Sequence, residues 1–179
     1  MVIYPMSTTT RHNNLIRQVC ADAVARLKEL LVLKQANLFS EEIPLVYWGK
    51  GDSWTRLVDI DKLEDENYFV AEVMNDLKYV MPDFMLFKNS SYLENERQTR
   101  IAGRPDLILE VWSKWNVEEE RDFKRGLYSS SEITEHWYIE QENNVVECYK
   151  GAVRLPDQNL SDILRSRDGI EFDLTYLAL

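Results

Sequence analysis

Cysteine is scarce in this chain, and long apolar runs are absent. Its two cysteines, Cys20 and Cys148, are too few for a disulfide scaffold and too far apart for a zinc ribbon. We expect both to be buried free thiols. The longest apolar runs fall far short of the roughly 20 residues that cross a bilayer, so we expect no membrane partner. The first residues also lack the basic start and apolar middle of a signal peptide, so we expect a cytoplasmic protein.

Basic residues are also fewer than acidic residues in this chain. Lys and Arg number 21 against 31 Asp and Glu, which gives a formal net charge of -10. Because nucleic-acid binding draws most of its affinity from Lys and Arg at phosphates, this balance argues against a nucleic-acid partner. The segment 88–125 differs from the rest, because its basic residues match its acidic residues in number.

The chain length and the hydrophobic pattern predict one domain over residues 1–179. The expected order is helix, antiparallel strands, central strand, helix and strand, which describes an α/β or α+β domain with a mixed β-sheet flanked by helices. The pattern predicts a helix over 11–34 and a second helix capped by Asn116 and Glu119. It predicts a hairpin of strands 43–48 and 54–60, a central strand 105–112, and further strands over 68–73, 81–87, 135–140 and 145–150. An exposed loop is expected over 88–103 and a turn at Asn143-Asn144.

Residues 81–138 contain features that folding alone does not explain. MPDFMLF and RPDLILEVW each place a Pro-Asp pair at the start of an expected strand, and Glu110 lies inside the second strand among apolar neighbours. A buried carboxylate costs several kcal/mol unless it is paired, protonated or bound to a cation. Glu110 therefore needs a partner, and the candidates are Asp83, Lys124 and a metal ion.

Strand geometry separates the two aspartates. Asp106 and Glu110 share a strand face but lie about 13 Å apart at a rise of 3.3 Å per residue, too far to share one ion. Asp83 lies on a different strand, and an adjacent strand at about 4.8 Å would place it beside Glu110. Metal-dependent phosphodiester hydrolysis needs carboxylates on a hard cation and a cationic group near the phosphate. Asp83, Glu110 and Lys124 supply such a set, and Asp106 is a secondary candidate.

The order of these motifs resembles the PD-(D/E)XK nuclease superfamily, and more closely a bacterial Uma-type family of restriction-endonuclease-like proteins. The matching residues are Pro82-Asp83, Pro105-Asp106-Leu107, Glu110-Val111-Trp112-Ser113, Lys124 with Tyr128, and Glu135-His136-Trp137. The resemblance implies a restriction-endonuclease-like core. It also implies an endonuclease that uses Mg²⁺ (or Mn²⁺) to hydrolyse phosphodiester bonds of DNA.

In the wider superfamily the catalytic lysine stands two residues after the glutamate, where this chain has Trp112. The resemblance implies that the lysine has moved to the helix as Lys124. Lys114, on the same strand face as Glu110, is a second candidate that we rank lower because the family usually has proline there. Tyr128, four residues after Lys124, is a further secondary candidate. The chain also departs from the family pattern at Ser113-Lys114-Trp115, beside the expected site.

Two functions follow as alternatives. In the first, Asp83 and Glu110 hold the metal and Lys124 stabilises the developing phosphate charge, with Arg97, Arg100 and Arg104 as the expected phosphate contacts. In the second, the chain is a catalytically silent nuclease-like fold that serves as a protein-interaction or dimerisation module, for example as a homodimer. The acidic balance and the tryptophan at the usual lysine position favour the second.

Overall fold

The computed structural model describes residues 10–40, 43–49, 55–64, 74, 77–95 and 99–178. Its elements in chain order are α1 (Thr10–Val32), β1 (Asn37–Ser40), β2 (Leu45–Trp48), β3 (Arg56–Leu57), a 3-10 turn (Ile60–Lys62), β4 (Lys78–Val80), β5 (Phe84–Phe87), β6 (Tyr92–Glu94), β7 (Ile101–Gly103), β8 (Leu107–Trp112), α3 (Glu118–Ser129), β9 (Glu135–Glu140), β10 (Val145–Lys150), β11 (Val153–Arg154), β12 (Gln158–Asn159), β13 (Ile163–Arg165), β14 (Glu171–Asp173) and a second 3-10 turn (Thr175–Leu177). The strand expected over 68–73 lies outside the described residues. None of the helices in the described part is long and apolar enough to cross a membrane.

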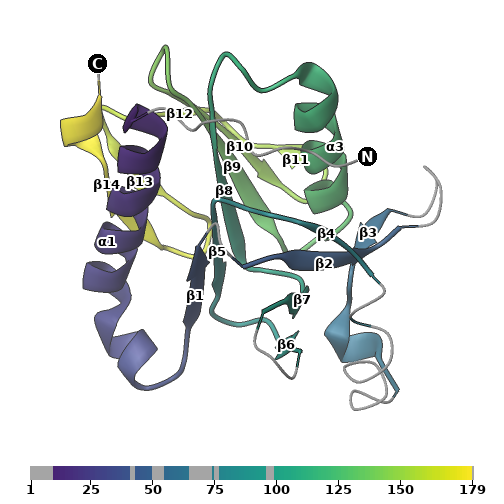
Figure 1. Cartoon of the computed structure of the whole chain (residues 1–179). Coiled ribbons are helices and arrows are strands. Elements are labelled where there is room, and N and C mark those ends of the chain that lie inside the picture. Colours follow the sequence, from purple (N-terminus) through teal and green to yellow (C-terminus); the bar gives the residue numbers. More distant parts are fainter. Residues whose placement is uncertain are drawn as a thin grey trace.

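The larger sheet has the strand order β1-β5-β8-β9-β10-β11, and β12 pairs with β10. β8 is antiparallel to β5 and parallel to β9, while β9 is antiparallel to β10. The parallel pair needs a crossover connection, and α3 provides it. Figure 1 shows α1 and α3 on opposite sides of this sheet. The expected mixed sheet flanked by helices is therefore confirmed.

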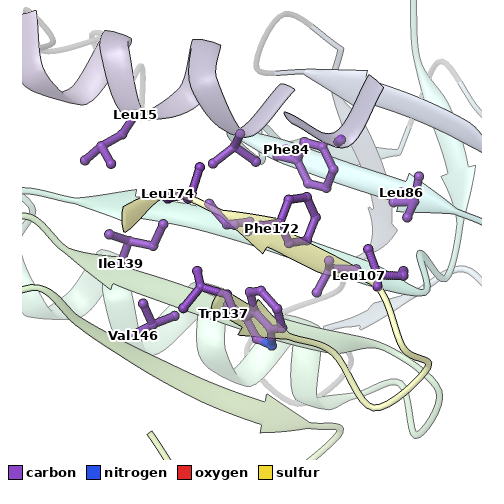
Figure 2. Packing of buried hydrophobic residues seen from close by; sticks show 14 of the residues in the cluster. Leu15, Phe84, Leu86, Leu107, Trp137, Ile139, Val146, Phe172 and Leu174 are labelled. Atoms are coloured by element: carbon purple, nitrogen blue, oxygen red, sulfur yellow. The ribbon is translucent and has the colours of Figure 1, made fainter. Parts of the chain in front are cut away.

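The face of the sheet toward α1 is the main apolar core. Leu107, Leu109 and Val111 of β8 belong to it together with Leu15 of α1. Figure 2 shows how Leu15, Phe84, Trp137 and Phe172 pack together between α1, the sheet and β14. A fully buried side chain of this kind contributes about 1.5–3 kcal/mol by leaving water. The two cysteines belong to the same region, with Cys148 buried and Cys20 half-buried.

The opposite face of β8 turns Ile108, Glu110 and Trp112 toward α3, because successive side chains of a strand alternate between faces. Trp112 is 1% exposed, and its ring centroid lies 4.2 Å from that of Tyr138. The guanidinium carbons of Arg121 and Arg125 lie 4.7 and 4.5 Å from the Trp112 ring centroid. Trp112 thus packs in the core and attaches α3 to the sheet through two cation–π contacts.

A second sheet has the order β3-β2-β7-β6, with β4 paired to β2. β2 and β3 are antiparallel, as expected of the hairpin, although residues 50–54 lie outside the described part. The exposed loop expected over 88–103 is wrong, because β6 and β7 pair antiparallel and β7 is buried. β7 joins β2 in parallel at Leu45 and Ile101, a pairing between distant segments that local polarity does not reveal. Gly103 is required there, since a Cβ would meet the Ser91 carbonyl oxygen at 2.8 Å.

The cap expected for the second helix is also wrong. Val117 occupies the N-cap position with φ -74° and ψ 147° and makes no side-chain cap. Asn116 instead accepts a hydrogen bond from the Ser113 backbone N–H through its side-chain oxygen at 2.9 Å. The asparagine oxygen thus stabilises the turn after β8, while its amide group donates to the Glu120 side chain of α3 at 3.5 Å and caps no backbone N–H of the helix.

Candidate active site

The pairing of β5 and β8 places Asp83 beside Glu110. Phe84 is opposite Leu109 in this antiparallel pair, so the next position outward brings Asp83 opposite Glu110. The Asp83 carboxylate accepts a hydrogen bond of 2.7 Å from the Val111 backbone N–H. Alternation along β5 turns Phe84 toward α1 and Met85 toward α3, and Asp83 shares the face of Met85. Both carboxylates thus belong to the α3 face of the sheet.

Glu110 is the centre of this site. Its side chain is only 1% exposed. One carboxylate oxygen, Oε2, accepts a hydrogen bond from the Lys124 ammonium at 2.7 Å, and the other, Oε1, accepts one from the Tyr128 hydroxyl at 2.6 Å. Lys124 and Tyr128 are one turn apart on α3, which places both over the same strand residue. The structure therefore brings together three residues that the sequence singled out separately.

Lys124 also lies near a second carboxylate of its own helix. Its ammonium is 3.8 Å from Glu120 Oε1, against 2.7 Å from Glu110. The Lys124 side chain is 12% exposed, so it is directed inward and is not a surface partner of Glu120. The ammonium thus lies near the carboxylates of Glu110 and Glu120. The Asp83 carboxylate also acts on it electrostatically.

The charges in this site shift the acidity of its groups. Burial raises the pKa of Glu110 to about 7, Lys124 works against that rise, and the Asp83 carboxylate adds to it. Burial alone would lower the pKa of Lys124, but the Glu110 and Asp83 carboxylates outweigh it and raise that pKa above its usual value. Burial, followed by the charge of Glu110, raises the pKa of the Tyr128 hydroxyl well above its usual value. Lys124 is therefore charged and Tyr128 neutral near pH 7.

The residues present fit a hard divalent cation. Asp83 and Glu110 place two carboxyl groups beside the single ammonium of Lys124, Glu110 becomes anionic above about pH 7, and each hydrogen-bonded oxygen of Glu110 keeps a further lone pair. Mg²⁺ is commonly held by one or two carboxylates, with waters and substrate phosphate filling the other positions. Within the described residues there is no group of three or more His, Cys, Asp or Glu side chains that would enclose a metal.

Asp106 has a different set of partners. Its Oδ2 accepts hydrogen bonds from the backbone N–H groups of Lys88, Asn89 and Ser90 at 2.7, 3.0 and 3.1 Å, and from the Ser90 hydroxyl at 2.7 Å. Burial would raise the pKa of Asp106, but these donors outweigh it and lower that pKa. The carboxylate thus holds the chain that leaves β5 against the start of β8.

The remaining basic candidates lie apart from Glu110. Lys114 is exposed, and its ammonium lies 5.0 Å from the Trp115 ring centroid. Arg104 forms an ion pair of 2.7 Å with Asp59, and the Arg100 guanidinium lies 5.1 Å from the Tyr79 ring centroid. Arg97 is outside the described residues. Lys124 is the basic side chain that the structure brings to Glu110.

The sequence did not reveal a buried network next to the site. His136 Nε2 is 2.9 Å from the Gly151 carbonyl oxygen, and His136 Nδ1 is 2.7 Å from the Tyr138 hydroxyl. Because a carbonyl only accepts, Nε2 carries the proton and Nδ1 accepts from Tyr138. Burial, with a smaller effect of Arg125, lowers the pKa of His136 to about 4 despite the opposing hydrogen bond to Gly151. The imidazole is therefore neutral near pH 7.

The neutral state of His136 predicts a specific pH dependence of stability. The unfolded chain binds a proton at this residue below about pH 6.5, whereas the folded protein binds it only near pH 4. The free energy of unfolding should therefore lose about 3 kcal/mol as pH falls from 6.5 to 4. Urea unfolding should show a smaller loss over this range in His136→Gln than in the wild type. Equal losses in both proteins would contradict this assignment.

The mixed sheet, the α3 crossover and the carboxylate–ammonium cluster define a restriction-endonuclease-like domain. A family model described as "Putative restriction endonuclease" (Uma2) matches residues 53–179, and the chain belongs to this family. A solved structure described as a putative nuclease belonging to DUF820 from Anabaena variabilis has a TM-score of 0.62, covers 99% of this chain and 87% of its own, and is 14% identical. That likeness shows a common fold. A search of curated proteins found no match.

Proposed function

We propose that the protein is an endonuclease that hydrolyses phosphodiester bonds of DNA with Mg²⁺ or Mn²⁺. The observation that carries the proposal is the buried Glu110 carboxylate, which lies 2.7 Å from the Lys124 ammonium and close enough to Asp83, the residue before β5, for that carboxylate to raise its pKa. An ion pair that served folding alone would not need a second carboxylate beside it. Membership in a family described as "Putative restriction endonuclease" supports DNA as the substrate.

In this proposal Asp83 and Glu110 hold the metal ion. When bound, the ion would activate a water molecule and neutralise charge on the scissile phosphate. The Val111 N–H fixes Asp83, and the Tyr128 hydroxyl fixes Glu110, so neither carboxylate needs to reorganise. The Lys124 ammonium, held by Glu110, stabilises negative charge that develops on the phosphate oxygens.

The direct test of this function is cleavage of plasmid DNA by the purified protein. We expect cleavage that requires Mg²⁺ or Mn²⁺ and stops when the metal is removed with EDTA. The same assay also tests whether the protein cleaves single-stranded RNA. No cleavage of either nucleic acid with either ion would overturn the proposal.

Metal affinity should depend on pH through Glu110. Because burial raises the pKa of this carboxyl to about 7, it binds a proton below that pH and is no longer an anionic ligand. The apparent affinity for Mn²⁺ should fall up to about tenfold per pH unit below pH 7 and level off above it. Electron paramagnetic resonance of free Mn²⁺ measures the affinity from pH 5.5 to 8.5. An affinity that stays constant across this range would contradict the role of Glu110.

A catalytically silent interaction module is the competing proposal. The observation in its favour is that both oxygens of Glu110 are already hydrogen-bonded within the protein, by Lys124 and Tyr128. In that case the cluster would fasten α3 to the sheet, and no ion would bind. A stable dimer in analytical ultracentrifugation, together with no Mn²⁺ binding at pH 8, would favour this alternative.

A further inference from the structure

The turn that follows β8 is held firmly by hydrogen bonds. We call residues 113–117 the Trp115 turn. Its backbone is bonded at several points: Ser113 N–H to Asn116 Oδ1 at 2.9 Å, Asn116 N–H to the Ser113 carbonyl at 3.1 Å, Trp115 N–H to Ser113 Oγ at 3.3 Å, Lys114 N–H to Glu142 at 3.2 Å, and the Arg121 guanidinium to the Ser113 carbonyl at 2.8 Å. These bonds stabilise the backbone conformation of the turn.

Two large apolar side chains of this turn nevertheless face solvent. Trp115 is 58% exposed and Val117 is 54% exposed. A single exposed apolar residue is ordinary on a protein surface. Two exposed apolar residues within three positions of one hydrogen-bonded turn form a small apolar patch. The Lys114 ammonium lies over the Trp115 ring, 5.0 Å from its centroid, so a positive charge lies next to the aromatic ring. An aromatic ring beside a basic group is the combination that binds a base and its phosphate.

The Trp115 turn lies close to the proposed catalytic centre. Trp115 follows Glu110 by five residues, so about 16 Å of extended chain is the greatest separation of their backbones. One nucleotide of a duplex strand advances about 3.4 Å, so the turn lies within about five nucleotides of a phosphate held at Glu110. Two acids near the turn, Glu140 and Glu118, are ion-paired with Arg121 and Arg125. These pairs reduce the repulsion from Glu140 and Glu118, whereas Glu142, which accepts the Lys114 N–H, and the exposed Glu119 leave negative charge beside the turn.

We propose that the Trp115 turn binds an unpaired base of the DNA substrate, with Trp115 stacked on the base and Lys114 at the adjoining phosphate. This inference rests on the proposed nuclease function and adds a substrate class to it: DNA that is single-stranded or gapped near the scissile bond. In a continuous duplex each base face is already covered by its neighbours, so the ring has nothing to stack on without unstacking a step.

The test compares binding of a single-stranded oligonucleotide and of a blunt duplex, in Ca²⁺ to prevent turnover. Trp115→Ala should weaken single-strand binding about tenfold. It should change duplex binding less than threefold. Trp115→Phe keeps a stacking ring and should restore most of the affinity. Tyr176→Ala is the matched control: Tyr176 is 60% exposed and bonds Gln18 of α1, on the other side of the sheet from α3, so this variant should bind like the wild type.

Several outcomes separate this inference from the proposed function. Wild-type single-strand affinity in Trp115→Ala, with metal-dependent cleavage intact, would overturn the inference and leave the nuclease proposal standing. Absence of nucleic-acid binding by the wild-type protein would overturn both. Loss of a dimer in Trp115→Ala with unchanged DNA binding would assign the turn to contact between two copies of the chain, which also overturns the inference.

Discussion

Replacing Glu110 by glutamine should lower metal-dependent DNA cleavage by about 100-fold or more. The amide nearly matches the carboxylate in shape, and its oxygen can still accept a hydrogen bond from Tyr128. The variant loses the negative charge that would ligate the ion and that pairs with Lys124 at 2.7 Å. Initial rates of cleavage with saturating Mg²⁺, measured on equal amounts of folded protein, give the effect.

The matched control for this variant is Asp162→Asn, which removes the same charge from an exposed position on the loop between β12 and β13. Its cleavage rate should equal that of the wild type. A Glu110→Gln protein that keeps more than half of the wild-type rate would contradict the assignment of Glu110 as a metal ligand. Circular dichroism of both variants excludes unfolding as the cause of a loss.

Replacing Lys124 by methionine should destabilise the protein by about 3–5 kcal/mol at pH 8.5, because it leaves the buried carboxylate of Glu110 without a cation. The loss should be smaller at pH 5.5. At that pH Glu110 binds a proton in the folded variant, since burial already raises its pKa to about 7 in the presence of Lys124. Urea unfolding at the two pH values measures both free energies.

The direction of this pH effect follows from linkage. A carboxyl whose pKa is higher in the folded protein than in the unfolded chain stabilises the folded state at acid pH, and that contribution is lost as pH rises through the folded pKa. Lys62→Met serves as the control, because Lys62 is 80% exposed and its loss should change stability by at most about 0.5 kcal/mol. A Lys124→Met loss that is equal at both pH values would contradict the buried pair.

The sequence was sufficient to predict the elements that carry the site. β8 is an apolar run interrupted by one carboxylate, and that pattern predicted both a central strand and the need of Glu110 for a partner. The spacing of strands placed Asp83 on a neighbouring strand, and the β5–β8 pairing confirms that adjacency. Lys124 was one of the candidate partners of Glu110, but its i, i+4 spacing to Glu120 was also typical of a surface ion pair, and the family resemblance decided between the two.

Other features depended on contacts that local sequence does not encode. β6 and β7 are short and lie in a polar stretch, and the pairing of β7 with β2, to which β6 adds through β7, is a long-range event. Asn116 and Glu119 matched a capping box, yet the asparagine bonds Ser113 instead. The bonds of Asp106 to residues 88–90 and of His136 to the Gly151 carbonyl likewise join groups that become neighbours only in the folded sheet.

The most direct measurement of the central claim is a crystal structure of the protein soaked with Mn²⁺, with the ion located by its anomalous scattering. We expect one peak within coordination distance of both the Asp83 and the Glu110 carboxylates, with Lys124 still next to Glu110. A map with no peak at these two carboxylates at pH 8, or a peak held by other residues, would contradict it.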